Sequence, residues 1–438
     1  MFPVRRGRVV ALTATIALIG MTTACGSGDS GDSGSGAGGA PADKPSGEIL
    51  VLTNRTDIVG TTFKDYATKF QAKYPEVKVK FQALTDYEGE VKTRMSTKQY
   101  GDVLLIPAGV AKADYADFFE PLGKPDDLSK KYRYVDSATV DGTTYGLATF
   151  GNATGIVYNK KVFKEAGIAA LPKTSDEFLT DLQAIKTKTK ATPYYTNYKD
   201  GWPLSWPQGA MGSVSGDKDA LVKMADNKAP WTAGQEKDTL DSLLFDAVQK
   251  GLTEKDPTTT NWENSKNLIA TGKIGVLPLG SWAIAQMKDA ATKAGTSPDD
   301  IGFMPMPFQV DGAYQSPVGP DFNQAININS THKAAARAWI DWMVNDSGYS
   351  DVVGGLPTLR DGKTPAQLKD FEASGVKFVE MVPSAKLDAV DKQSEIGLTQ
   401  PDYYRDLVDA ARGASGKNKQ QIFDGLNSKW AAAIPKAG

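Results

Sequence analysis

The sequence has few of the residues that most enzyme mechanisms use: its 438 residues include one cysteine, Cys25, and one histidine, His332. A single cysteine excludes an intramolecular disulfide and a cysteine metal cluster. His332 stands at the start of a predicted helix, where a solvated position is expected. Nucleophilic triads of serine or cysteine with histidine are therefore nearly excluded.

The chain also lacks a surplus of either charge, with 50 lysines and arginines against 52 aspartates and glutamates. It has no basic block that would suit a phosphate backbone, so a nucleic-acid partner is not expected. It has no G-x-x-x-x-G-K-[ST] motif, so nothing indicates a nucleotide-hydrolysing loop of that type. The length and the 40% hydrophobic content suit two domains, each with its own core.

Residues 1–24 have the composition of a secretory signal peptide. Three arginines lie among the first eight residues, an apolar run follows from Val9 to Met21, and small residues precede Cys25. The apolar run is short for a membrane span. The stretch TTAC resembles the bacterial lipoprotein box, in which the cysteine becomes the lipid-bearing first residue. The alternative is a soluble secreted protein in which this thiol has no role.

Residues 25–47 comprise the predicted lipidated cysteine and a run rich in glycine, serine and aspartate, without a large apolar side chain. Such a composition cannot form a core and is typical of a flexible tether. A lipid anchor on a tether predicts a protein held at the extracytoplasmic face of the cell membrane.

From residue 48 onward the hydrophobic pattern alternates between strands and helices. Apolar runs at 48–52, 77–83 and 102–107 are expected as strands, with helices at 61–75 and 87–101. This order predicts an α/β fold whose sheets are mostly parallel and are flanked by helices.

The second half of the chain continues the pattern. Thr174 and Glu177 have the spacing of a capping box at a helix start, and segment 238–252 is again helical in period. A strand is expected at 274–277, ended by Pro278 because proline cannot donate to a ladder.

Four motifs follow one another along the chain. They are Val140–Leu179, with YGL, YNKKVFKEAG and PKTSDEF; GKIGVLPLGSW at Gly272–Trp282; Ala325–Val344, with AININ and KAAARAWIDWMV; and GGLPTLRD at Gly354–Asp361. Together they resemble the extracellular solute-binding proteins of ABC transporters, the group that includes maltose-binding protein. The resemblance extends over about Ile49–Trp430.

This resemblance implies a type II periplasmic-binding-protein fold, with two lobes hinged around a cleft. We expect lobe 1 to comprise residues 48–150 and 312–345, and lobe 2 residues 151–311 and 346–438. The expected protein is a monomer that needs no cofactor or metal and hydrolyses nothing. It would close over a sugar or oligosaccharide and pass it to the transmembrane subunits of an ABC permease.

Candidate ligand-binding residues lie in the loops after the predicted strands, where open α/β sheets bind ligands. Aromatic faces suit the apolar C–H face of a sugar, and carboxylates, amides and arginine suit its hydroxyls. Trp282 is the strongest candidate because it follows a strand, opens a helix and belongs to a family motif. The others are Asn54, Arg55, Asp57, Glu88, Phe150, Asn152, Asp321 and Phe322. For each of these, a role as a helix cap or turn residue is the alternative.

Trp202 and Trp206 lie four residues apart in YKDGWPLSWPQGA, and each is followed by a proline that argues against a long helix. We expect this segment to form a wall of the sugar site, with packing of the indoles under their own loop as the alternative. Trp339, Trp342 and Trp430 lie on predicted helices and are expected in the core. The remaining tryptophans of the polar connections, at positions 231 and 262, carry no assignment.

Two other classes of protein stay open. A secreted glycoside hydrolase needs a pair of carboxylates, which the composition cannot exclude. A binder of a polyamine or a metal is the other class. The adjacent Tyr403 and Tyr404 would suit ferric iron, although the segment also fits a helix with Tyr404, Leu407 and Ala411 on one face.

Overall fold

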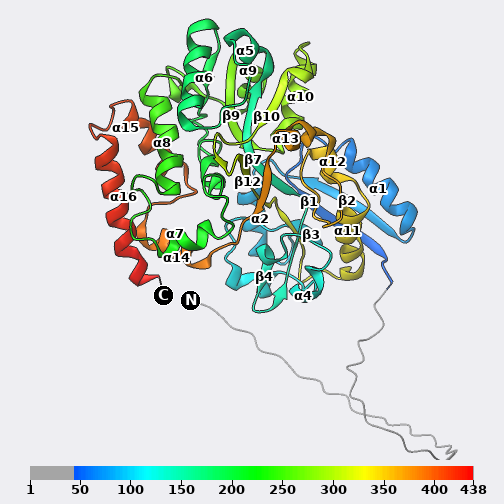
Figure 1. Cartoon of the computed structure of the whole chain (residues 1–438). Helices are drawn as coiled ribbons and strands as arrows, with labels where there is room; N and C mark the ends of the chain where they lie inside the picture. The colour runs from blue at the N-terminus through cyan, green and yellow to red at the C-terminus, as the bar shows by residue number, and fades with distance from the viewer. Residues whose placement is uncertain (1–43, 438) are drawn as a thin grey trace, which may run out of the picture. The chain divides into compact units, whose positions relative to one another are not determined.

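The computed structural model describes residues 44–437, except for the side chain of Trp206. The predicted signal peptide at 1–24 and the predicted lipid-bearing Cys25 lie outside the described residues. Within residues 44–437, no helix is long and apolar enough to cross a membrane. Two larger sheets with flanking helices make up this part of the chain (Figure 1).

The first sheet has five strands in the order β2–β1–β3–β13–β6. Their bounds are Gly47–Thr53 for β1, Val77–Ala83 for β2, Val103–Leu105 for β3, Leu147–Ala148 for β6 and Asn323–Ile326 for β13. β1 runs parallel to β2 and β3, whereas β13 is antiparallel to β3 and β6. The three strands expected near the start of the folded region are confirmed, and they form the parallel part of this sheet.

The second sheet has the order β11–β12–β7–β9–β8, with β10 paired to β7 and β14 paired to β12. The bounds are Gly151–Asn159 for β7, Thr192–Tyr194 for β8, Ile274–Gly280 for β9, Ile301–Met304 for β10, Gln309–Val310 for β11, Ala313–Pro320 for β12 and Lys377–Glu380 for β14. β7 is antiparallel to β9, β10 and β12. The α/β class is confirmed, but the expectation of mostly parallel sheets is wrong here. The long strand β7 is entered by a crossing from the first sheet, and all three of its neighbours run against it.

The helices cover both sheets. The longer ones are α1 (Thr62–Lys73), α2 (Tyr87–Met95), α5 (Lys160–Ala166), α6 (Ser175–Lys188), α7 (Ala220–Asp226), α8 (Glu236–Gln249), α9 (Trp262–Ala270), α10 (Ala283–Lys293), α11 (Lys333–Asn345), α14 (Ala385–Ser394), α15 (Pro401–Ala411) and α16 (Lys419–Ala433). Short elements are α3 (Tyr115–Phe118), α4 (Pro125–Leu128), β4 (Thr139–Val140), β5 (Thr143–Thr144), α12 (Tyr349–Val353) and α13 (Lys369–Ala373). The 3-10 helices are η1 (Lys112–Asp114), η2 (Val135–Ala138), η3 (Trp206–Ala210), η4 (Pro257–Thr259), η5 (Pro298–Asp300), η6 (Ala366–Leu368) and η7 (Ile434–Lys436).

Local sequence explains several of these helices. The side chain of Thr174 accepts a hydrogen bond from the backbone N–H of Glu177, as predicted for the start of α6. Glu177 itself accepts from the N–H of Lys173 rather than closing the box on Thr174. The predicted core positions of Trp339, Trp342 and Trp430 are confirmed, since all three are buried.

β9 continues through Pro278, so the strand end predicted there is wrong. β8 pairs with β9 as far as Val276, and beyond that residue β7 pairs with β9 up to Gly280. A proline has no N–H to donate, and it is tolerated on a strand edge that has no ladder partner. This extension brings the strand end to Ser281 and Trp282.

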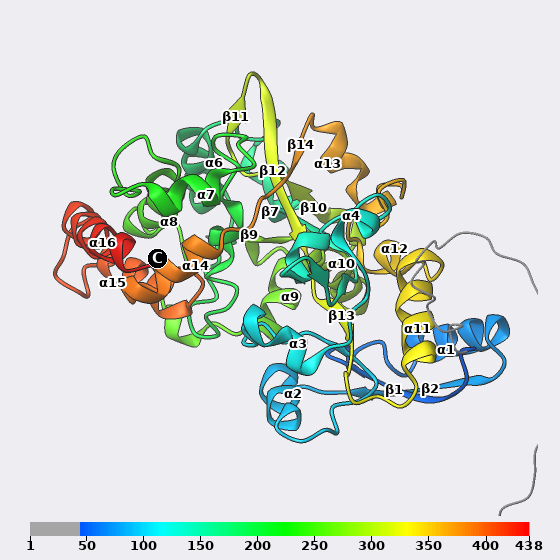
Figure 2. The ribbon, with the colours of Figure 1, turned by 90° about the horizontal axis from the view of Figure 1, so that it is seen from below.

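Three segments connect the two sheets. Residues 149–150 join β6 to β7, residues 321–322 join β12 to β13, and the chain after α12 passes beside β7. These segments lie side by side, because Thr149 N–H donates to the carbonyl of Phe322 and Asp321 N–H to that of Phe150, each at 2.9 Å. Figure 2 shows β12 running from the β11 hairpin toward β13.

The strand pairing bears on the expected lobes. Within segment 312–345, expected to return to lobe 1, β12 pairs in the second sheet and β13 in the first. Within 346–438, expected in lobe 2, Tyr349 and Val353 are buried in the core beside the first sheet. Each of these two segments therefore has parts beside the first sheet and parts beside the second. The exact bounds of the two lobes stay a prediction.

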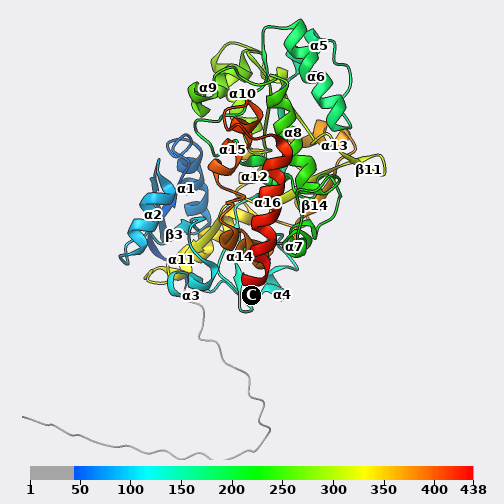
Figure 3. The same cartoon turned by 90° about the vertical axis from the view of Figure 1, so that its left-hand side faces the viewer.

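Helices α15 and α16 lie alongside α8 (Figures 1 and 3) and enclose a buried polar cluster. Lys237 and Asp241 are 1% and 0% exposed, and their side chains are 2.9 Å apart. Asp241 also accepts hydrogen bonds from Trp231 and Tyr403, and Lys237 donates to Tyr404 at 3.2 Å. Tyr403 and Tyr404 are thus hydrogen-bonded to buried side chains of α8. This pairing does not support the alternative in which they bind ferric iron.

Replacing Asp241 with asparagine should lower the free energy of unfolding by about 3–5 kcal/mol, because the fully buried Lys237 would lose the carboxylate that stabilises its charge. Asp65→Asn is the matched control. It removes an exposed Asp65–Lys69 pair with the same four-residue spacing, and should cost less than about 0.5 kcal/mol. Urea denaturation at pH 7 measures both, and equal losses in the two variants would contradict this account.

Candidate functional site

A cleft of about 820 Å³ is lined by residues associated with both sheets. This volume lies within the range of roughly 300–1,000 Å³ that is typical of small-molecule sites. The polar and aromatic lining residues include Thr53, Asn54, Arg55, Asp57, Thr85, Phe150, Trp202, Trp262, Glu263, Lys266, Trp282, Gln286, Asp321, Phe322, Gln324 and Tyr349.

Three tryptophans meet in the cleft. Trp202 lies 4.8 Å from Trp262 and 5.8 Å from Trp282 between ring centroids, and Trp262 lies 5.7 Å from Trp282. They come from different elements: the loop after β8, the start of α9, and the residue preceding α10. Trp202 keeps 41% of its surface exposed. An apolar ring at such exposure offers a face to a ligand rather than to the core.

Arg55 and Asp57 form the polar side of the cleft that follows β1. The guanidinium of Arg55 donates to both carboxylate oxygens of Asp57, at 2.8 and 2.7 Å, and to the hydroxyl of Tyr349 at 3.2 Å. Burial opposes the charge of each group. The hydrogen bonds between them prevail, so the pKa of Arg55 is raised and the pKa of Asp57 is lowered. Both groups are therefore charged and held in a fixed orientation.

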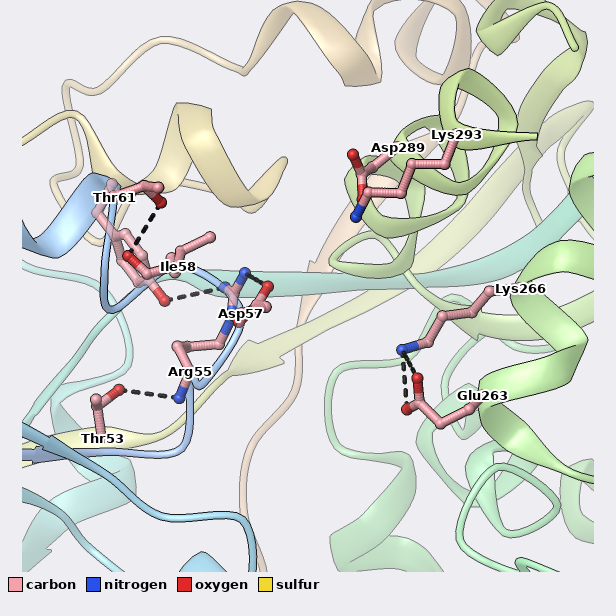
Figure 4. A network of polar contacts seen from close by, with 10 residues as sticks. Thr53, Arg55, Asp57, Ile58, Thr61, Glu263, Lys266, Asp289 and Lys293 are labelled. Atoms are coloured by element: carbon pink, nitrogen blue, oxygen red, sulfur yellow. Dashed lines mark hydrogen bonds and ion pairs between the residues drawn. The ribbon is translucent and has the colours of Figure 1, made fainter. Parts of the chain in front are cut away.

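Across the cleft lie two further ion pairs (Figure 4). Lys266 pairs with Glu263 on α9 at 2.9 Å, and Lys293 pairs with Asp289 on α10 at 2.6 Å. The Lys266 ammonium also lies 5.0 Å from the ring centroid of Trp262. This ammonium contributes to the lowering of the Asp57 pKa, so the charges on the two sides of the cleft interact.

Asp321 lies in the crossing between β12 and β13. One carboxylate oxygen accepts from the backbone N–H of Phe322 at 2.9 Å, and the other accepts from the amide of Asn152 at 2.7 Å. Burial raises the pKa of Asp321 above its ordinary value, against the effect of these two hydrogen bonds. A desolvated carboxylate with fixed oxygens is a strong acceptor for a ligand hydroxyl.

The inner end of the cleft carries buried hydrogen-bonding atoms without a protein partner. They are Nε2 of Gln324 and Nε1 of Trp339, and both residues line the cleft. In the described part of the chain, Oδ1 of the neighbouring Asn152 has no partner either. Buried polar atoms in native proteins are nearly always satisfied, so these atoms favour a polar ligand or water at this end.

Most of the residues predicted for the site are brought together. Trp282, Trp202, Asn54, Arg55, Asp57, Phe150, Asp321 and Phe322 all line the cleft. Asn152 does not line it but orients Asp321 through the hydrogen bond described above. The side chain of Trp206 lies outside what the structure describes, and its backbone belongs to η3.

Glu88, like Asn152, does not line the cleft. It lies in the first turn of α2, where its carboxylate accepts from the backbone of Ala108 and Gly109. Thr85, three residues earlier in the same connection, lines the cleft instead. The helix begins at Tyr87, and its first turn directs the carboxylate to another loop.

Sequence reasoning missed the contribution of α9. Trp262, Glu263 and Lys266 all line the cleft, although Trp262 carried no assignment. Asn261 caps the helix by accepting from Asn264 N–H at 2.9 Å, and this cap within TTTNWENSKNL is the signal that could have placed Trp262 at a helix start. In residues 44–437 no group of three or more histidine, cysteine, aspartate or glutamate side chains is arranged to hold a metal ion.

Residues 54–349 match the family model described as bacterial extracellular solute-binding protein. The chain belongs to this family. The diacetylchitobiose binding protein DasA of Streptomyces coelicolor is 31% identical over 369 residues, 79% of this chain and 81% of that protein. A multiple sugar-binding protein of Streptococcus mutans is 27% identical over 396 residues, 86% of this chain and 88% of that protein.

Solved structures agree with this assignment. BlMnBP1, a binding protein of an ABC transporter from Bifidobacterium animalis subsp. lactis in complex with mannobiose, has a TM-score of 0.81 and 34% identity. BlMnBP2 from the same organism, a manno-oligosaccharide specific solute binding protein in complex with mannotriose, has a TM-score of 0.82 and 32% identity. Each match covers 89% of this chain and 95% of the other. The predicted type II periplasmic-binding-protein fold is confirmed, and these relatives are binding proteins.

The raised pKa of Asp321 predicts a pH-dependent term in stability. The folded protein holds the proton of the Asp321 carboxyl group more tightly than the unfolded chain, in which the pKa is about 3.8. The resulting contribution to the free energy of unfolding is fully present below about pH 3.8 and is lost as the pH rises through the raised pKa. The stability of the wild type relative to Asp321→Asn should therefore fall as the pH rises from about 4 through the raised pKa of Asp321, and should level off above it. Urea denaturation of both proteins over this range tests it, and a constant difference would be the opposite result.

Proposed function

We propose that this protein is the substrate-binding subunit of an ABC importer and captures a sugar or an oligosaccharide in the cleft. The observation that carries the proposal is the meeting, in one cleft, of three tryptophan rings with the polar groups of Arg55, Asp57 and Asp321. Rings suit the C–H face of a sugar, and fixed charged groups suit its hydroxyls. Diacetylchitobiose, mannobiose and mannotriose, named for its relatives, belong to the same ligand class.

The capture step that we propose is closure of two lobes, one around each sheet, with bounds near 48–150 with 312–345 and 151–311 with 346–438. A ligand that contacts both sides of the cleft binds the closed form better and therefore shifts the population toward it. The transmembrane permease subunits would recognise that form. The protein would act as a monomer, without a cofactor, and would not hydrolyse the sugar.

The charges of the cleft support a neutral ligand over a polyamine. Of the three carboxylates that line the cleft, Asp57 and Glu263 are each paired with a cation from their own side, Arg55 and Lys266, and only Asp321 has neutral partners. A polycationic ligand would need several carboxylates that are free to pair with it, whereas the cleft offers one, and it would be repelled by these two cations.

We further propose that Cys25 carries a lipid that holds the protein at the extracytoplasmic face of the membrane, after removal of residues 1–24. The sequence around this residue supports the proposal. In a bacterial host that processes lipoproteins, the wild type should fractionate with membranes and Cys25→Ala should not. Identical fractionation of the two proteins would contradict the anchor.

The proposed function is tested by thermal denaturation of the mature protein with a panel of mono- and oligosaccharides. A bound sugar should stabilise the folded state by mass action, by about 2.7 kcal/mol at a concentration of 100 times its dissociation constant. The melting temperature should rise accordingly. Product analysis of the same mixtures should show no hydrolysis. If no sugar shifts the transition, the carbohydrate assignment is wrong, and if sugar is consumed, the protein is an enzyme.

Variants of the tryptophan cluster locate the site. Trp282→Ala should weaken sugar binding at least about tenfold, equivalent to about 1.4 kcal/mol, and Trp282→Phe should lose less because a ring remains. Trp202→Ala should also weaken binding. Trp231→Phe is the control: this indole is buried in a core away from the cleft, so stability should fall while affinity stays unchanged. Calorimetric titration measures the sugar affinity of all four variants. Unchanged affinity in both Trp282→Ala and Trp202→Ala would place the sugar elsewhere.

A further inference from the structure

The loop that carries Trp202 into the cleft is held by a helix that lies outside the cleft. Arg405 of α15 donates from Nε to the carbonyl of Tyr198 at 3.0 Å and from Nη2 to the carbonyl of Lys199 at 2.7 Å. Its Nη1 donates to the carboxylate of Asp402, on the same helix, at 2.8 Å. Of the described residues that line the cleft, none belongs to α15. One guanidinium therefore ties two consecutive carbonyls of a cleft loop to a helix that has no place in the site.

The same loop packs closely against the start of α15. Gly201 is buried and has a φ of +79°. A Cβ atom at this position would lie 2.5 Å from Cβ of Pro401 and 2.7 Å from Nη2 of Arg405. Both the backbone angle and the close approach require glycine here. Further along α15, Asp409 accepts a hydrogen bond from the hydroxyl of Tyr198 at 2.8 Å, so side chain and backbone of the loop are both attached to this helix.

The attached backbone determines the direction of Trp202. Its neighbours Gly201 and Pro203 are buried, and Leu204 is 2% exposed. Within residues 201–204, only Trp202 is exposed. Because the chain is buried on both sides of it, the indole is turned outward into the cleft.

Asp200 ties this loop to a second tryptophan of the cleft. Its carboxylate accepts a hydrogen bond from the backbone N–H of Trp262 at 2.7 Å. Trp262 is the first residue of α9, where a backbone N–H has no partner within the helix and a negative charge is favourable. The backbone N–H of Lys199 also donates to the hydroxyl of Thr260 at 2.8 Å. These two bonds join the loop to the start of α9, where the rings of Trp202 and Trp262 lie 4.8 Å apart.

We propose that Arg405 and Asp200 are positioning residues of the sugar site. Arg405 fixes the backbone that carries Trp202, and Asp200 fixes the spacing between this indole and that of Trp262. Neither Arg405 nor Asp200 lines the cleft, so they act on the ligand only through the rings. A loop that is free to move must be ordered when a ligand binds, and the cost of ordering it lowers affinity. This inference rests on the proposed function and adds residues outside the site that determine how tightly it holds a sugar.

Arg405 is tested by calorimetric titration with mannobiose and diacetylchitobiose. Arg405→Ala removes both bonds to the loop and should weaken the binding of a sugar that the wild type binds by at least about fivefold. Arg405→Lys keeps the charge but lacks the fork that reaches two carbonyls, so its affinity should lie between the two. Arg94→Ala is the matched control. The side chain of Arg94 is also 28% exposed, pairs with Glu90 and donates to Gln82, and none of these residues lines the cleft. Its loss should leave affinity unchanged.

Asp200 is tested in the same titrations. Asp200→Ala removes the acceptor of the Trp262 N–H and should weaken binding at least about threefold. Asp200→Asn keeps an acceptor oxygen without the charge and should recover most of the affinity. A loss as large in Asp200→Asn as in Asp200→Ala would show that the charge matters and the hydrogen bond does not, which would contradict the positioning role of Asp200.

Deuterium exchange of the sugar-free protein separates positioning from a general loss of stability. In Arg405→Ala, backbone amides of residues 198–205 should exchange faster than in the wild type, while amides of α2 and β7 should not change. Faster exchange over the whole chain would overturn the inference, because Arg405 would then only stabilise the fold. Wild-type affinity in both Arg405→Ala and Asp200→Ala would overturn it as well, although the proposed function would stand. If the wild type binds neither sugar, the inference fails together with the carbohydrate assignment on which it rests.

Discussion

The structure depends on the way in which the crossing segments between the two sheets are tied together. Phe150 and Asp321, on adjacent crossings, share a backbone hydrogen bond, and Asn152 joins the carboxylate of Asp321 at 2.7 Å. Gly151 and Leu356 exchange two further backbone bonds, at 2.6 and 2.7 Å, which bind the third segment to the first two. Because backbone groups here are paired across segments, the crossings act as one unit. The same unit supplies Phe150, Asp321 and Phe322 to the cleft.

This arrangement explains why the cleft can combine apolar and polar contacts. The first sheet and the crossings contribute charged groups whose orientations are fixed by neighbours, and loops and a helix start beside the second sheet contribute the three clustered indole rings. Groups that are already oriented cost little additional ordering when a ligand binds. A polar ligand loses its water on entry, and only a site that offers both kinds of contact compensates for that loss.

Sequence alone predicted the local elements well, because strands β1, β2 and β3 and helices α1, α6 and α8 have clear hydrophobic periods. It also led to the expectation that Trp282 and Asp321 would lie at a cleft, and both line it because each follows the end of a strand; their contact with a ligand stays a prediction. Prediction from the sequence failed for features that are set by pairing between distant segments. The direction of β7 relative to its neighbours, the extension of β9 through Pro278 and the position of Trp262 beside two other indoles all depend on contacts between residues far apart in the chain. The expectation for Glu88 failed for a local reason: this residue lies in the first turn of α2, and its carboxylate is held by the backbone of Ala108 and Gly109.

The central claim is that a neutral oligosaccharide binds between the tryptophan cluster and the crossing segments. A crystal structure of the mature protein grown with mannotriose tests it most directly. We expect one saccharide ring against Trp282 and hydroxyl groups within hydrogen-bond distance of Asp321 and Arg55. A saccharide bound outside the cleft, or a cleft filled by a charged solute retained from the host instead of the sugar, would contradict the account.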